Sequence, residues 1–90
     1  MTIDDIRKEI DRLDSELLTI FNQRAELALK IGYLKKDLGL PVYDPNREKR
    51  IFTKMEERNP GPLDNNAIKR LFERVIDESR TLERIKSKGR

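Results

Sequence analysis

The sequence predicts an all-α fold, a bundle built from two copies of a three-helix chain. Apolar residues recur every three or four positions along three segments, which is the spacing of amphipathic helices, and no segment alternates like a strand. The first of these segments is too long for the other two to cover. A chain of 90 residues also buries little surface alone, so oligomerisation is expected. We expect residues 1–90 to form a single domain.

The first helix is predicted over residues 3–38. Its apolar positions alternate by four and three when position 24 is counted as a member of the series, which is a heptad stripe. The stripe consists of Ile6, Ile10, Leu13, Leu17, Ile20, Leu27, Ile31, Leu34 and Leu38. Thr2 with Asp5 resembles a capping box, and Gly39 followed by Pro41 ends the helix.

The length of this helix is the argument for a dimer. It would extend roughly 54 Å at about 1.5 Å per residue. A compact domain of this size has a radius of gyration near ~12 Å. The other two helices cannot cover so long a stripe, and a second copy lying along it can.

Two shorter helices follow. Asp44 and Pro45 are an N-cap and a first-turn proline, and the helix runs to about Arg58. The segment 59–62, Asn-Pro-Gly-Pro, then breaks the chain, and Asp64 can cap a third helix. The inner faces are predicted at Ile51, Phe52 and Met55, and at Ile68, Leu71, Phe72, Val75, Ile76, Leu82 and Ile85.

Composition excludes several kinds of chemistry. The chain has no Cys and no His, which removes disulfides, thiol nucleophiles, Cys/His zinc sites and general bases built on imidazole. Arginines, lysines, carboxylates, hydroxyls and two tyrosines remain for catalysis.

Charge and hydropathy give little sign of a nucleic-acid or membrane partner. The 20 Lys and Arg residues interleave with 17 Asp and Glu residues along most of the chain, as on a solvated helical surface. Only the tail from Arg84 to Arg90 is one-sidedly basic, and it has no aromatic residue to stack on bases. Without an export signal or a long apolar run, we expect a soluble, cytoplasmic protein.

Polar residues interrupt the predicted apolar faces on all three helices. Arg24 lies on the heptad stripe, where a buried guanidinium is costly unless it meets an anion. Lys35 lies eleven residues later, within ~20° of Arg24 around the helix and ~16 Å along it. Ser79 interrupts the stripe of the third helix, with Glu83 one turn beyond. The second helix begins with Asp44, Arg47 and Glu48.

Each of these residues also has an ordinary structural interpretation. Arg24 could set the register of the helix pair, and Lys35 could reach solvent along its stem. Ser79 could bond the preceding turn, and Asp44 could serve only as an N-cap. Their coincidence on three helices favours a buried site for a small, polar, anionic molecule.

The same positions match a known family in identity and spacing. The matching residues are Arg7, Leu17–Leu18, Arg24–Ala28, Ile31–Gly32, Lys35, Pro41–Asp44, Arg47–Glu48, Leu71–Phe72, Ser79 and Glu83. Together they resemble the all-helical (AroQ-type) chorismate mutases over about residues 5–85. The resemblance implies an intertwined homodimer that converts chorismate to prephenate in phenylalanine and tyrosine biosynthesis. It implies no metal and no cofactor, because this pericyclic rearrangement needs neither.

The resemblance also assigns a binding role to each polar residue. Arg24 and an Arg7 borrowed from the partner chain would hold the two carboxylates of chorismate, with Ser79 helping. Asp44 and Glu48 would receive the ring hydroxyl. Helix geometry agrees with the borrowing, because Arg7 lies ~25 Å along the axis from Arg24 and about 100° around it.

The remaining assignments concern catalysis. Arg47 would balance the charge of the bound dianion, and Lys35 and Glu83 would flank the ether oxygen of the breaking bond. The catalytic set is thus Lys35, Glu83 and Arg24. Some relatives carry Gln where this chain has Glu83, so Glu83 must be protonated to donate a hydrogen bond there. Arg80 stands where several relatives have an apolar wall residue, which predicts a rotated third helix or a more open wall.

Two other functions fit the same residues less well. An isochorismate pyruvate lyase-like activity would use similar clamps on the same scaffold. A non-catalytic helical dimerisation or regulatory module of an aromatic-pathway enzyme would have no reason to bury Arg24, Lys35 and Glu48. Docking on another enzyme of that pathway is compatible with either activity.

Overall fold

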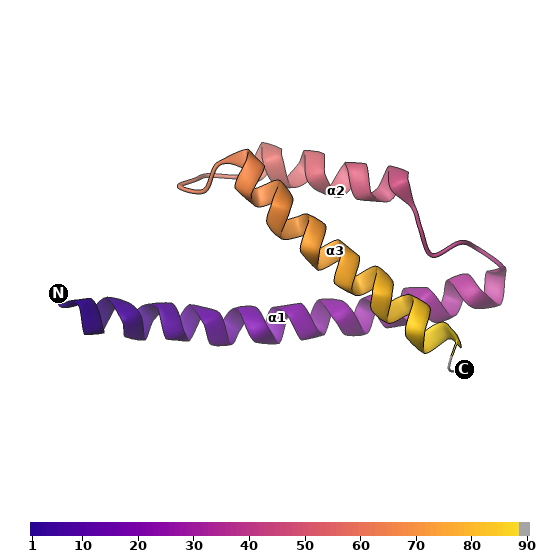
Figure 1. The fold of residues 1–90 in the computed structure, drawn as a ribbon, viewed down its shortest axis with the longest axis horizontal. Coiled ribbons are helices and arrows are strands. Elements are labelled where there is room, and N and C mark those ends of the chain that lie inside the picture. Colours follow the sequence, from indigo (N-terminus) through magenta and orange to yellow (C-terminus); the bar gives the residue numbers. More distant parts are fainter. Residues whose placement is uncertain (89–90) are drawn as a thin grey trace.

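The protein consists of three helices joined by two short connections (Figure 1). The computed structural model describes the backbone of residues 1–88 and the side chains of residues 1–85. Helix α1 spans Ile3–Leu38, α2 spans Pro45–Arg58 and α3 spans Asn65–Lys88. No strand occurs in this part of the chain, which confirms the predicted all-α, three-helix protomer. The last two residues of the basic tail, 89–90, lie outside the described residues.

Helix α1 begins and ends where its capping residues predict. The Thr2 hydroxyl accepts from the Asp5 amide at 3.1 Å, and the Asp5 carboxylate accepts from the Thr2 amide at 3.0 Å. At the other end Gly39 adopts a φ of 70°, a left-handed conformation that a side chain disfavours. Its amide and that of Leu40 then bond carbonyls of the last turn.

The shorter helices are capped by aspartates, as predicted. Asp44 accepts from the amide of Arg47 at 3.1 Å, and Asp64 accepts from the amide of Ala67 at 2.8 Å. Between α2 and α3, the Asn59 side chain donates to the Leu63 carbonyl at 2.7 Å. This bond ties the proline-rich connection to the start of α3.

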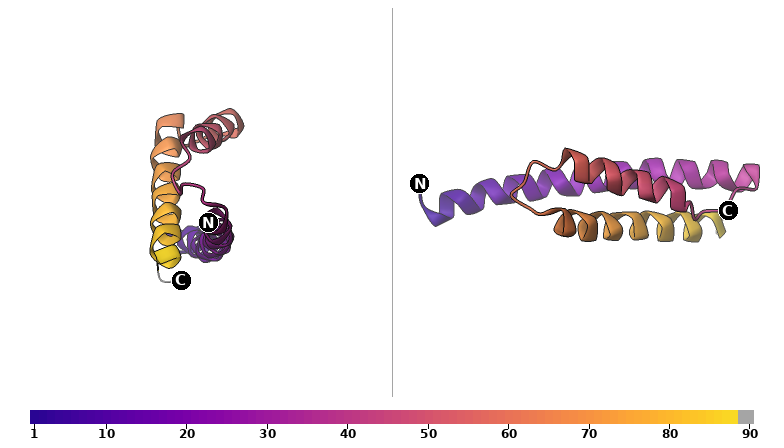
Figure 2. Two further views of the ribbon diagram at one scale, coloured as in Figure 1. Left: turned by 90° about the vertical axis from the view of Figure 1, so that its right-hand side faces the viewer. Right: turned by 90° about the horizontal axis from the view of Figure 1, so that it is seen from above.

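Helix α3 is the element that joins the other two. It packs against both α1 and α2, whereas α1 and α2 make no helix–helix packing contact among the described residues. Figure 2 shows α1 and α2 on the same side of α3, near its opposite ends. The chain is therefore extended, with a radius of gyration of 16.2 Å and a longest dimension of 55 Å.

Helix α1 approaches α3 closely at Gly32. A Cβ atom at this position would lie 3.1 Å from both Cβ and Cγ of Glu83. Ala28 and Ile76, which are also buried, lie on the same two helices. The small residues of α1 thus allow α3 to lie close to it.

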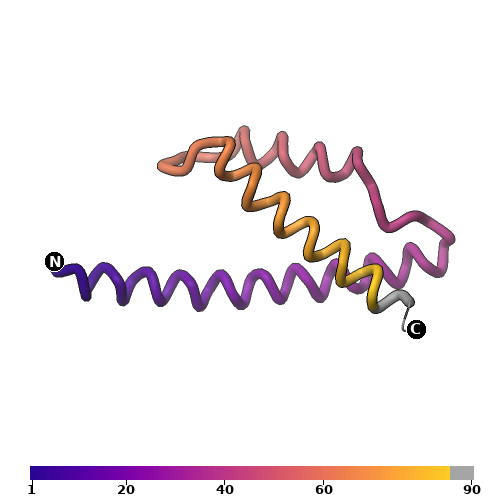
Figure 3. Tube along the Cα trace, viewed as in Figure 1, coloured from indigo at the N-terminus to yellow at the C-terminus, as the bar shows by residue number. Residues whose placement is uncertain are grey.

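The apolar stripe of α1 is not covered by its own chain. The first part of α1 extends past the other helices (Figure 3). The nine stripe residues named above are 46–70% exposed, as the length argument predicts for a single copy. Two residues of the predicted inner face of α3, Leu71 and Ile85, are also more than half exposed. None of the described helices combines the length and the hydropathy needed to span a membrane.

Removal of the α3 cap should destabilise the fold. Asp64→Ala leaves the Ala67 amide without its acceptor, and we expect a loss of about 1 kcal/mol of unfolding free energy. In a domain of this size that lowers Tm by roughly 4–8 °C, measured by circular dichroism at one protein concentration. Asp64→Asn is the control, because Asn caps as well as Asp. An unchanged Tm for Asp64→Ala contradicts the role of this cap.

Candidate active site

The three helices enclose a pocket of about 460 Å³ on the side of α3 that faces α1 and α2. Every predicted site residue except Arg7 lines it. The polar lining consists of Arg24, Lys35, Asp44, Arg47, Glu48, Ser79, Arg80 and Glu83, and the apolar lining of Leu27, Ala28, Ile31, Val42, Ile51 and Ile76. The fold thus brings together residues up to 59 positions apart, from Arg24 to Glu83.

Arg24 and Ser79 form a direct link between α1 and α3. Nη1 of Arg24 donates to the Ser79 hydroxyl at 2.7 Å, and this hydroxyl donates to the Val75 carbonyl at 2.9 Å. The Ser79 hydroxyl therefore bonds the preceding turn, as its structural interpretation predicts, and it also accepts a bond from Arg24. Burial lowers the pKa of Arg24, and so does the neighbouring Arg47, while Glu83 opposes the shift.

Lys35 and Glu83 face each other across the helix crossing. Nζ of Lys35 lies 3.9 Å from Oε2 of Glu83 and donates to the Val42 carbonyl at 3.0 Å. Glu83 is only 8% exposed, because α1 approaches it at Gly32. Burial raises the pKa of Glu83, although the positive charges of Lys35 and Arg24 partly offset this effect. The site therefore favours the protonated carboxyl more than open solvent does.

The start of α2 contributes the remaining polar residues. The Asp44 carboxylate is engaged as the N-cap, so its role in the fold is clear from the structure. Glu48 pairs with Arg80 of α3, with 3.1 Å between Oε2 and Nη1. This pairing could not be found by helical periodicity, since the two residues lie 32 positions apart. One feature of the sequence could have indicated that Arg80 lies near the pocket. It directly follows Ser79, at the border of the helix face that contains Ser79.

Arg80 lines the pocket with a charged side chain rather than an apolar one. Its second nitrogen, Nη2, bonds Asp77 at 2.6 Å, and the guanidinium lies 5.1 Å from the ring centre of Tyr43. Tyr43 thus contacts a charged residue of the pocket lining, which the residue pattern did not predict.

Arg7 lies elsewhere. It is exposed, near the start of α1, and does not belong to the pocket lining. This agrees with the expectation that it cannot reach the pocket of its own chain. The stripe residues in this first part of α1 are uncovered, like those in the rest of the helix.

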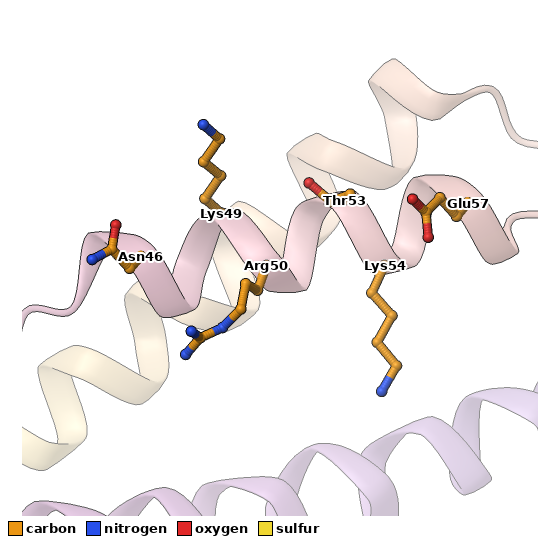
Figure 4. A pocket seen from close by; sticks show the side chains of 6 residues that line it. All are labelled: Asn46, Lys49, Arg50, Thr53, Lys54 and Glu57. Carbon is orange, nitrogen blue, oxygen red and sulfur yellow. The ribbon is translucent and has the colours of Figure 1, made fainter.

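A second hollow lies along α2, and none of the predicted site residues lines it. It is lined by Asn46, Lys49, Arg50, Thr53, Lys54 and Glu57. Figure 4 shows these side chains spreading in different directions along the helix, with Lys49 and Lys54 pointing apart. Because its polar side chains do not converge on one point, this hollow lacks a usual feature of ligand-binding sites.

Comparison with known proteins shows similarity to chorismate mutases. The family model described as chorismate mutase type II matches residues 6–84. A bifunctional chorismate mutase/prephenate dehydratase of Aquifex aeolicus is 37% identical over 84 residues, which cover 89% of this chain. This chain spans only about a quarter of the length of such bifunctional relatives, 23% in that case.

Two solved structures are similar over nearly their whole length. A chorismate mutase of Thermus thermophilus is 39% identical with a TM-score of 0.90, covering 91% of this chain and 93% of that one. A chorismate mutase of Helicobacter pylori, solved in complex with prephenate, is 32% identical with a TM-score of 0.84, covering 91% and 89%. By its sequence, its three-helix fold and the pocket between those helices, this chain belongs to the chorismate mutase type II family.

Proposed function

We propose that this protein is a chorismate mutase, which rearranges chorismate to prephenate without a cofactor. The observation that carries the proposal is the pocket itself, where cationic side chains of α1 and α2 meet a buried carboxyl of α3. Family membership supports it, and so does the similarity to a structure that contains prephenate, the product. The bifunctional relatives, which join this activity to a prephenate dehydratase, support docking beside the enzyme that consumes prephenate.

The proposed reaction suits a pocket without nucleophiles. Chorismate carries two carboxylates and a flexible enolpyruvyl group, which must fold over the ring before the bonds exchange. Arg24 would bind one carboxylate, assisted by the Ser79 hydroxyl that it already contacts. Charge-assisted bonds from a guanidinium fix both position and orientation, and such fixation lowers the barrier by removing unproductive conformers.

Lys35 would stabilise the transition state. As the C–O bond lengthens, negative charge grows on the ether oxygen, and a fixed ammonium group in a dry pocket offsets it. The Val42 carbonyl holds Nζ of Lys35 in place before the substrate arrives. A protonated Glu83, whose Oε2 lies 3.9 Å from this nitrogen, would donate a second hydrogen bond to the same oxygen.

A second copy of the chain would complete the site. The uncovered stripe of α1 offers an apolar surface for an antiparallel partner helix, since it continues for nearly the whole length of α1. Such a partner would bring its own Arg7 toward the pocket, where it would bind the second carboxylate. The homodimer thus explains both the exposed stripe and the distance of Arg7 from the pocket of its own chain.

Removal of the Lys35 ammonium should greatly slow turnover. Lys35→Ala is expected to lower kcat by about 10²–10³, the usual cost of losing one donor to a developing oxyanion. The measurement is the loss of chorismate absorbance in the ultraviolet. Lys30→Ala, on the exposed face of the same helix, is the control and should keep wild-type turnover.

Two outcomes of this assay contradict the proposal. One is wild-type protein that leaves chorismate unchanged, and the other is full turnover by Lys35→Ala. Pyruvate release from isochorismate, without conversion of chorismate, would instead identify the lyase activity.

The pH dependence should report the protonation of Glu83. Because the protonated carboxyl is the form that donates, activity should fall as pH rises through the Glu83 pKa, which burial has raised. Glu83→Gln can donate at every pH, so its kcat/KM profile should be flat over this range. An identical decline in the wild type and in Glu83→Gln would show that another group titrates.

Mixing two inactive variants should restore activity if Arg7 acts across the dimer. Arg7→Ala and Lys35→Ala are each expected to be inactive. In a mixed dimer, one site has Lys35 from one chain and Arg7 from the other, and is intact. Refolding an equal mixture from denaturant should therefore give roughly a quarter of wild-type activity, because half the dimers are mixed and one of their two sites works. A mixture that stays inactive contradicts the shared site.

A further inference from the structure

Arg80 is held on three sides by groups of its own chain. Nη1 lies 3.1 Å from the Glu48 carboxylate, Nη2 lies 2.6 Å from that of Asp77, and the guanidinium lies over the Tyr43 ring. Only 24% of its side chain is exposed. The two ion pairs and the ring together fix the position and plane of this guanidinium.

Its surroundings differ from those of Arg24, which extends from α1 to Ser79 of α3. Arg24 lines the same pocket but bonds the neutral hydroxyl of Ser79, so its charge can attract an anion. The charge of Arg80 is already compensated by two carboxylates. Arg80 is therefore a poor candidate for binding a substrate carboxylate, although it lies at the pocket.

Glu48 is a pocket residue that forms an ion pair with Arg80. Its side chain is 21% exposed, and Arg80 binds Oε2. The other oxygen, Oε1, has no hydrogen-bond partner among the residues that the structure describes. A carboxylate in a pocket for a dianion is unfavourable unless a cation compensates it and a donor uses its free oxygen.

We propose that Arg80 is a positioning residue, which holds the Glu48 side chain oriented so that Oε1 accepts the ring hydroxyl of the substrate. This inference rests on the proposed function, and it goes further by assigning to Arg80 the orientation of Glu48. Arg80 acts through Glu48 and makes no contact with the reacting bonds.

A double-mutant cycle tests the link between these residues. Arg80→Leu should lower kcat/KM for chorismate about tenfold, which corresponds to about 1.4 kcal/mol. The loss should lie mostly in KM, because the hydroxyl is bound alike in the ground and transition states. In a Glu48→Gln background, Arg80→Leu should change kcat/KM less than twofold. Arg80→Lys should recover part of the loss, because one donor to Oε2 remains.

The matched control is Arg74→Leu. Arg74 lies on the same helix and pairs with Glu78 at 3.2 Å, but both side chains are exposed and outside the pocket. This variant should keep the wild-type kcat and KM. Circular dichroism verifies that each variant remains helical, and if Arg80→Leu does not fold, Arg80→Lys takes its place in the cycle.

A modified substrate separates positioning from simple packing. Chorismate with a methylated ring hydroxyl cannot donate to Oε1, and this hydroxyl takes no part in the bonds that form and break. With this compound, the wild type and Arg80→Leu should have KM values within twofold of each other. A role limited to packing would impair both substrates equally.

The possible failures are distinguishable. Wild-type protein that does not convert chorismate overturns the proposed function, and this inference with it. Active wild type overturns this inference alone if Arg80→Leu has no effect. The same holds if its effect is as large in the Glu48→Gln background, or as large with the methylated substrate.

Discussion

The close crossing of α1 and α3 is the contact on which the pocket depends. Gly32 removes the side chain that would otherwise meet Glu83 at 3.1 Å, and Glu83 is buried as a result. The same crossing brings Arg24 within hydrogen-bond distance of Ser79 and places Lys35 opposite Glu83. Burial then changes the proton affinity of the groups that it encloses. A packing feature thus produces the electrostatics of the site.

Most of the fold could be predicted because its signals are local. The helix limits follow from Thr2, Asp44, Asp64 and Gly39, each of which caps a helix through bonds within a few residues. The exposure of the apolar stripe of α1 could be predicted from the length of that helix alone. The apolar period marked which polar residues face inward, and the pocket contains all of these.

The contacts of Arg80 could not be predicted, because they depend on how α2 packs against α3. The spacing of apolar residues along a helix does not indicate how two helices pack. The Arg80–Glu48 pair joins residues 32 positions apart, and the contact of Arg80 with Tyr43 needs the exact course of the connection before α2. The contact at Gly32 is similar, because a glycine on a helix face does not indicate what lies opposite it. The sequence pattern therefore located the pocket, whereas its internal bonds required the structure.

The two connections between the helices are under different constraints. The one from Gly39 to Asp44 carries Val42, which holds Lys35, and Tyr43, which lies against Arg80. An inserted or deleted residue there would displace both anchors at once. The connection between α2 and α3 lines neither hollow and is tied mainly by Asn59, so it has more freedom to change length. Natural variation in chain length among proteins of this architecture should therefore gather at the second bend and spare the first.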